Sequence, residues 1–163
     1  MQERIGRYIS MIHRQEQRFV CKKMESYGLD LGFPEYLFLY GVSLYEGCMQ
    51  KDLCWLQGVD DAMATRSVRK LMERGYLFRN RQEEDRRAYR LYLTESGREI
   101  IPKLEEVLNQ WHREIIGEMD EGQRIQLTSQ LKRVAQLAQK VNGMENTGWP
   151  ELFGENRRER EKE

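Results

Sequence analysis

Apolar side chains recur every three or four residues in the first part of the chain, which is the spacing of an amphipathic helix. The first such stretch covers residues 4–27 and ends at Gly28, and Gly32 extends the break. Pro34 suits the first turn of a second helix, over about residues 34–45, because that turn needs no N–H donor at this position. The second helix is expected to bury Leu37, Phe38, Val42 and Leu44.

A shorter amphipathic stretch follows at residues 49–56, and a turn containing Gly58 separates it from a longer helical stretch at about residues 61–75. Asp60 or Asp61 is expected to cap the longer helix, since a carboxylate accepts a hydrogen bond from a free N–H of the first turn. A short helix, a tight turn and a longer helix form the helix-turn-helix pattern. This pattern alone is a weak signal.

The period changes from helical to alternating after Gly75. Residues 76–80 and 89–93 are rich in aromatic side chains at every second position, which predicts two antiparallel strands. The residues between them, 81–88, are almost all charged. A charged hairpin directly after a helix-turn-helix is a wing, and this order is much more specific than either part.

Two further helices are predicted after the hairpin. The first begins near Thr94 or Ser96, either of which can cap it. Pro102 lies inside this stretch and is expected to bend the helix or to delay its regular start. Asp120 is expected to cap the last helix. Much of the polar tail that follows, residues 144–163, is expected to be mobile.

The net charge gives no hint of a nucleic-acid partner, whereas the distribution of charge does. The chain has 27 basic and 27 acidic residues and a formal net charge of zero. Nine basic residues oppose four acidic ones between Ala62 and Arg90, so this segment carries a charge of +5. Such a local excess is typical of a phosphate-binding face, although a solvated surface gives the same pattern.

Several motifs in this region resemble those of the MarR family of regulators. The segment Asp85-Arg86-Arg87, followed by residues 91–97 with the sequence LYLTESG, resembles the family's Asp-x-Arg wing pattern and its LTxxG turn. Residues 64–71 and 73–77 resemble its recognition helix and the exit into the sheet. The order of elements is similar over residues 5–142, and the recognisable motifs cover residues 60–97.

The resemblance implies a mainly α fold with a small β-hairpin wing. This is an α+β winged helix with about six helices and a helical dimerisation region formed by both termini. The expected parts are a dimerisation helix at 1–32, a DNA-binding lobe at 33–97, dimerisation helices at 98–143 and a polar tail at 144–163. Within the lobe, the recognition helix is expected at about 61–75 and the wing at about 76–94.

The expected partner is double-stranded DNA with a palindromic operator. A recognition helix presents its first residues to base edges, where Arg66 can bond a guanine and Thr65 a base or a phosphate. Arg86 or Arg87 is the candidate for the minor groove, and the resemblance implies that Asp85 pairs with an arginine of the loop. The alternative is a set of ordinary solvated residues. The candidate DNA contacts are Thr65, Arg66, Arg69, Lys70, Arg79, Arg81, Arg86, Arg87 and Arg90.

Apolar stripes on the terminal helices predict a homodimer. The stripes include Ile5 and Ile9 in the first helix and Leu131 and Val134 in the last. Their exposure in a monomer would cost about 25 cal/mol per Å², and a palindromic operator requires two heads. The alternative is that these stripes close an intramolecular bundle.

The resemblance also implies a repressor that is relieved by a small aromatic or phenolic effector, bound between the dimerisation helices and the DNA-binding lobe. Some relatives instead sense oxidants through a cysteine in the first helix, which makes Cys21 an alternative sensor. Such a thiol needs a lowered pKa and access to solvent. The candidate pocket residues, which a plain aromatic core explains equally well, are Tyr8, Met11, Tyr36, Tyr40 and Trp111.

Other functions find little support in the sequence. His13 and His112 have no partner at ligand spacing, so neither a metal site nor a cofactor is expected. A phosphate loop and a nucleophile elbow are both missing, and an enzyme is therefore not expected. No stretch approaches the length of a membrane span, and a cytoplasmic protein with reduced thiols is expected. A winged helix that binds another protein in place of DNA is the alternative function.

Overall fold

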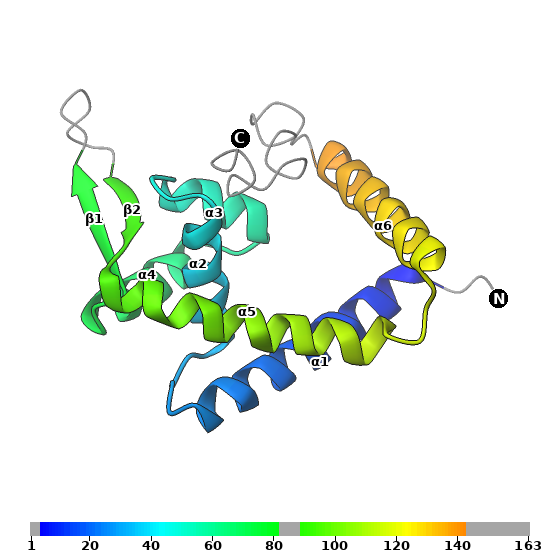
Figure 1. Cartoon of the computed structure of the whole chain (residues 1–163). Helices are drawn as coiled ribbons and strands as arrows, with labels where there is room; N and C mark the ends of the chain where they lie inside the picture. The colour runs from blue at the N-terminus through cyan, green and yellow to red at the C-terminus, as the bar shows by residue number, and fades with distance from the viewer. Residues whose placement is uncertain (1–3, 82–88, 143–163) are drawn as a thin grey trace, which may run out of the picture. The chain divides into compact units, whose positions relative to one another are not determined.

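The computed structural model describes residues 4–81 and 89–142, which belong to two compact units divided after Trp111 (Figure 1). The last turn of α5 belongs to the second unit, together with α6. The predicted fold class, mainly helical with one antiparallel hairpin, is confirmed. The elements are α1 (Ile5–Ser26), α2 (Phe33–Leu44), α3 (Gln50–Gln57), α4 (Asp61–Glu73), β1 (Leu77–Arg81), β2 (Tyr89–Leu93), α5 (Glu95–Ile116) and α6 (Glu121–Val141).

The two strands form the hairpin that the alternating pattern predicted. β1 and β2 pair antiparallel, with Leu77 opposite Leu93. Leu77, Leu91 and Leu93 are almost fully buried, while Phe78 stacks on Tyr92 on the other side with ring centroids 5.4 Å apart. One face of the hairpin therefore belongs to the core, as expected for an antiparallel pair with one solvated face. The wing tip at residues 82–88 lies outside the described residues.

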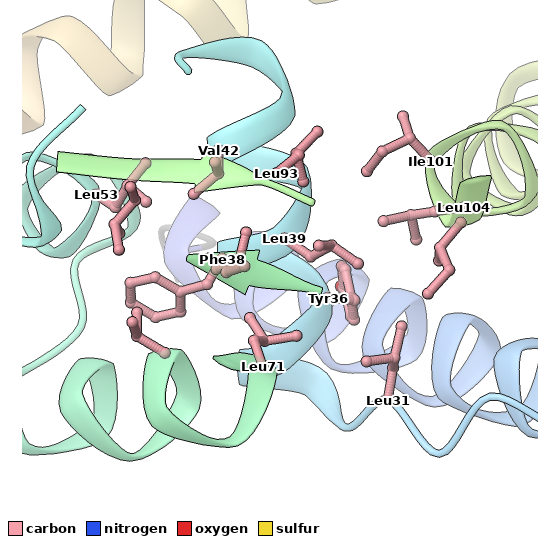
Figure 2. Packing of buried hydrophobic residues seen from close by; sticks show 14 of the residues in the cluster. Leu31, Tyr36, Phe38, Leu39, Val42, Leu53, Leu71, Leu93, Ile101 and Leu104 are labelled. Atoms are coloured by element: carbon pink, nitrogen blue, oxygen red, sulfur yellow. The ribbon is translucent and has the colours of Figure 1, made fainter. Parts of the chain in front are cut away.

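The core of the first unit surrounds α2, which contacts α1, α3, α4 and β2. Figure 2 shows Leu53 of α3, Leu71 of α4 and Leu93 of β2 gathered around Phe38 and Leu39. All of these side chains are buried. A helix that is apolar on nearly every face fits such a central place.

The predicted burial within α2 was wrong at two of its four positions. Phe38 and Val42 are fully buried, but Leu37 and Leu44 are only half-buried, and Leu39 is buried in their place. By the helical period the buried residues of α2 share one wide side of the helix, whereas Leu37 and Leu44 lie on the opposite side.

The beginning of α5 packs against the turn between α4 and β1. The Thr94 hydroxyl donates to the Gly75 carbonyl and accepts from the Gly97 N–H at 3.0 Å, so Thr94 is the cap among the two candidates. The Thr94 N–H donates to the Tyr76 carbonyl at 3.1 Å. A Cβ on Gly97 would overlap with that carbonyl oxygen. The glycine of the LTxxG turn is therefore required by a close backbone approach.

The last two helices follow the sequence pattern apart from the effect of proline. α5 is helical from Glu95 onward with Pro102 inside it, so the expected delay of its start was wrong. Pro102 is exposed, and water can hydrogen-bond the carbonyl that its missing N–H leaves free. Asp120 caps α6 as predicted, accepting from the Gln123 N–H at 2.9 Å. No helix in the described part of the chain combines the length and hydropathy needed to cross a membrane.

We expect Gly97→Ala to lower the free energy of unfolding by about 1–3 kcal/mol, because the added methyl group forces the α5 start away from the Tyr76 carbonyl. Gly6→Ala in α1 is the control: apart from the backbone of α1 itself, nothing lies within 4 Å of the place that a Cβ would take. Alanine there favours the helix by up to about 1 kcal/mol. Urea unfolding followed by circular dichroism measures both. Equal stability of the two variants would contradict the close approach at Gly97.

Candidate nucleic-acid interface

α4 presents one polar face and buries the other. Asp60 caps the helix by accepting a hydrogen bond from the Met63 N–H at 2.7 Å, as one of the two predicted candidates. Ala64, Ser67, Val68 and Leu71 are buried, and the helical period places Thr65, Arg66 and Arg69 on exposed positions. The residues expected to meet DNA are thus held on a helix whose other face is fixed in the core.

A side-chain bridge connects α4 with the hairpin. Gln50, the first residue of α3, donates from Nε2 to the Thr65 hydroxyl at 3.0 Å. Its Oε1 accepts from Nη2 of Arg79 in β1 at 2.9 Å. Gln50 is not among the candidate residues that the sequence indicated. Its place at the start of the helix that precedes the recognition helix is the signal that would have pointed to it.

Two arginines of β1 lie near Tyr89 of β2. Arg81 donates to the Tyr89 hydroxyl from Nε at 2.9 Å and from Nη2 at 2.7 Å, and its guanidinium carbon lies 5.3 Å from the centroid of the Tyr89 ring. The guanidinium carbon of Arg79 lies 6.0 Å from the same ring centroid. We use the name α4–β1 face for the exposed set Thr65, Arg66, Arg69, Arg79 and Arg81.

Two other predicted DNA contacts have structural partners inside the first unit. Lys70 Nζ lies 3.5 Å from the carboxylate of Glu35, which is 8% exposed. Arg90 donates from Nη1 to the Gly47 carbonyl at 2.7 Å. These contacts anchor α2 to α4 and the α2–α3 loop to β2, so each cation has a role that needs no ligand. Asp85, Arg86 and Arg87 lie outside the described residues.

The exposed helix residues differ in their ionic contacts. Arg69 Nε lies 3.5 Å from Glu73 Oε1, and both side chains are largely exposed. Such a surface pair contributes little to stability, so Arg69 is readily available to another anion. Arg66 borders a hollow between the start of α2 and α4, which Pro34 and Met63 also line.

The candidate effector residues lie in different environments. Tyr36 is 2% exposed, and its hydroxyl has no hydrogen-bond partner among the described residues. Burial, with the negative charge of Glu16 adding to it, raises the pKa of Tyr36 well above its ordinary value. Tyr8 and Met11 are exposed on α1. Tyr40 is half-buried beside the core, and Trp111 packs on Phe19 with ring centroids 5.4 Å apart.

The cysteine thiols are in environments that disfavour the thiolate. Burial raises the pKa of the half-buried Cys21 above its ordinary value, and the Glu35 carboxylate raises it further. Burial also raises the pKa of Cys48 to about 12 and that of Cys54 to about 11. A redox sensor needs the opposite shift. Within residues 4–81 and 89–142, no group of three His, Cys, Asp or Glu residues could hold a metal ion.

The helix-turn-helix, the hairpin and the α4–β1 face define a winged-helix transcription regulator, and comparisons with known proteins agree. Residues 18–104, more than half of the chain, match the transcriptional regulator family SarA/Rot. The HTH-type transcriptional regulator BilQ of Clostridium symbiosum (strain WAL-14163) is 28% identical over 128 residues, which cover 78% of this chain and 88% of that relative.

Solved structures give the same result. A MarR transcriptional regulator from Methanosarcina mazei Go1 has a TM-score of 0.77 at 32% identity, with 84% of this chain and 97% of that chain covered. A MarR family regulator from Listeria monocytogenes, complexed with 26mer DNA, has a TM-score of 0.79 at 18% identity, with 90% and 99% covered, which shows the fold alone. The chain therefore belongs to the SarA/Rot family of MarR-type winged-helix transcription regulators, and the MarR resemblance is confirmed. These relatives are regulators and not enzymes.

The raised thiol pKa values predict slow cysteine chemistry at neutral pH. A thiol with a raised pKa is almost entirely protonated at pH 7, so the reaction with iodoacetamide should be slower than that of free cysteine and should still accelerate above pH 9. The urea-unfolded chain is the control and should react at the ordinary rate. Mass spectrometry measures the modification of each cysteine. Fast modification of Cys21 at pH 7 would contradict its raised pKa and would favour a sensor role.

Proposed function

We propose that the protein is a dimeric, sequence-specific DNA-binding transcriptional regulator whose operator is a palindrome. The observation that carries this proposal is the α4–β1 face. It combines the exposed side of the second helix of the helix-turn-helix with two exposed arginines of β1, and both elements pack on one core.

In this proposal α4 enters the major groove. Arg66 bonds the edge of a guanine with two donors, and the Thr65 hydroxyl bonds a base or a phosphate oxygen. Arg69 remains available to a phosphate because its contact with Glu73 is solvated. Arg86 or Arg87, both of which lie outside the described residues, is the proposed minor-groove contact.

The other cations contribute mainly through their charge. Arg79 and Arg81 of β1 are exposed and can contact phosphates, which position a protein on DNA without reading its sequence. Lys70 and Arg90 keep their contacts with Glu35 and the Gly47 carbonyl. They therefore add to the positive potential and act at most as secondary phosphate contacts.

DNA binding should be steeply salt-dependent and should require Arg66. Between about 50 and 200 mM salt we expect a loss of affinity of about 10³-fold, because several phosphates are neutralised by the two heads. Arg66→Ala should weaken operator binding about tenfold or more, since one bidentate base contact is lost. Fluorescence anisotropy with a duplex from a genomic selection measures both.

The control for this experiment is Arg133→Ala, which removes the same charge from an exposed position of α6. It should leave the affinity close to that of the wild type. The proposed site would be refuted if the wild type bound no duplex at low salt, or if Arg66→Ala and Arg133→Ala bound the operator with equal affinity.

The dimer is proposed from apolar surface that each unit leaves exposed. On α1, Ile5, Ile9 and Ile12 are 56%, 41% and 52% exposed. In α6 no residue is buried in the single chain, and Leu131 is 44% exposed. A repeated apolar stripe on an otherwise polar helix favours a subunit interface, so the terminal helices are proposed to pair with those of a second copy.

Leu131→Glu should raise the dimer dissociation constant at least about tenfold, because the interface would have to bury one unpaired carboxylate from each copy. Gln136→Glu adds the same charge to α6 away from the apolar stripe and should have little effect. Sedimentation equilibrium gives both constants. A wild-type chain that stayed monomeric at micromolar concentration would contradict the dimer.

We further propose that the protein is a repressor relieved by a small aromatic or phenolic ligand and that it acts in the cytoplasm, where its operator would be found. The buried Tyr36 hydroxyl supports a polar ligand contact, since an unpartnered buried hydroxyl is unfavourable. A ligand acts only by binding one arrangement of the two heads more tightly than another. Phenolic compounds added to the anisotropy measurement test this part.

A further inference from the structure

One side chain, that of Gln50, bridges α4 and the hairpin at the surface, in addition to the packing of α4 against β1 in the core. Its amide nitrogen donates to Thr65 and its amide oxygen accepts from Arg79. Thr65 and Arg79 are exposed and Gln50 is half-buried, so the bridge is at the surface where the α4–β1 face would meet DNA. Its two hydrogen bonds use the donor and the acceptor of one amide at the same time.

The backbone around Gln50 is fixed to the hairpin. The Leu91 N–H donates to the Cys48 carbonyl at 2.9 Å, and the Gly47 N–H donates to the Leu91 carbonyl at 2.8 Å. Met49, directly before Gln50, forms an isolated antiparallel bridge with Arg90. The backbone next to Gln50 is therefore held to β2 by hydrogen bonds, and the Gln50 side chain extends from this backbone.

We propose that Gln50 is a positioning residue of the α4–β1 face, which sets the donor direction of Thr65 and the orientation of Arg79 before DNA binds. This inference rests on the proposed function. It deepens that function by assigning the side-chain orientations of Thr65 and Arg79 to one amide group.

The chemistry of the bridge gives Thr65 a defined role. Because the Thr65 oxygen accepts from Gln50, its own hydrogen is free to be donated to a base acceptor or a phosphate oxygen. Without the bridge the hydroxyl could present either its hydrogen or its lone pairs. Gln50 thus makes Thr65 a donor toward the DNA.

The same argument applies to Arg79. A long side chain that is ordered only on binding loses rotamer freedom, which weakens the complex. The Gln50 oxygen holds one Nη2 donor of Arg79 at 2.9 Å and leaves the other donors of the guanidinium for a phosphate. The bridge therefore lowers the cost of ordering this arginine.

The test compares Gln50→Met with the wild type. Methionine has a similar size and helix propensity to glutamine but forms neither hydrogen bond. We expect operator affinity to fall about five- to tenfold, while the urea midpoint and the dimer dissociation constant stay unchanged. Gln136→Met, at an exposed glutamine of α6, is the matched control and should not change affinity.

A double-mutant cycle separates positioning from direct contact. With Gln50 present, the effects of Thr65→Ala and Arg79→Ala on operator affinity should be coupled by about threefold or more, because both side chains depend on the same bridge. In the Gln50→Met background the two effects should be additive. If the coupling persisted in the Gln50→Met background, it would not run through Gln50 and the positioning role would be wrong.

A readout without DNA keeps the inference distinct from the proposed function. ¹⁵N relaxation of the Arg79 Nε–H in the free dimer should show greater side-chain mobility in Gln50→Met than in the wild type. Unchanged mobility would overturn the inference while leaving DNA binding intact. A wild type that orders Arg79 through Gln50 but binds no duplex would overturn the proposed function and with it the use of the bridge.

Discussion

The packing of α2 against its neighbours is the interaction on which the arrangement of the first unit depends. α2 contacts α1, α3, α4 and β2, and Phe38, Leu39 and Val42 have no exposed surface. Burying one such side chain contributes about 1.5–3 kcal/mol. The helix that carries Arg66 and the strand that carries Leu91 are therefore placed relative to each other through a common apolar partner.

Polar contacts at the edge of the core add further connections between the elements that the core holds together. Lys70 meets the buried Glu35 carboxylate where α4 crosses the start of α2. Arg90 bonds the Gly47 carbonyl, and Thr94 joins the turn after α4 to the beginning of α5. Each contact lies at the rim of the core, where a charged or hydroxyl group can find a partner without being fully removed from water. The bridge at Gln50 is the outermost of them.

Much of this fold could be predicted because its determinants are local. The hydrophobic period identified the helices, the alternation of Tyr89 to Leu93 identified the second strand, and Asp60 and Asp120 identified two helix starts. The same period identified the exposed side of α4. The exposure of Thr65, Arg66 and Arg69 could therefore be predicted from the sequence.

What could not be predicted depends on contacts between residues far apart in the chain. The contacts of Lys70 with Glu35 and of Arg90 with the Gly47 carbonyl could not be predicted, because both partners lie outside the local segment. Leu37 and Leu44 were expected to be buried because α2 is apolar on nearly every side, so its sequence does not mark which side faces the core. Gln50 has no charge, and although it begins the helix before the recognition helix, only the fold brings it between Thr65 and Arg79.

The division of α4 into two faces has a consequence for how such regulators diversify. Ala64, Ser67, Val68 and Leu71 are in the core, whereas Thr65, Arg66 and Arg69 contact little of it. Substitutions at the second group can therefore accumulate with small effects on folding, since exposed positions usually change stability by less than about 0.5 kcal/mol. Single substitutions at exposed positions can therefore change the target sequence step by step, while each successive variant stays folded.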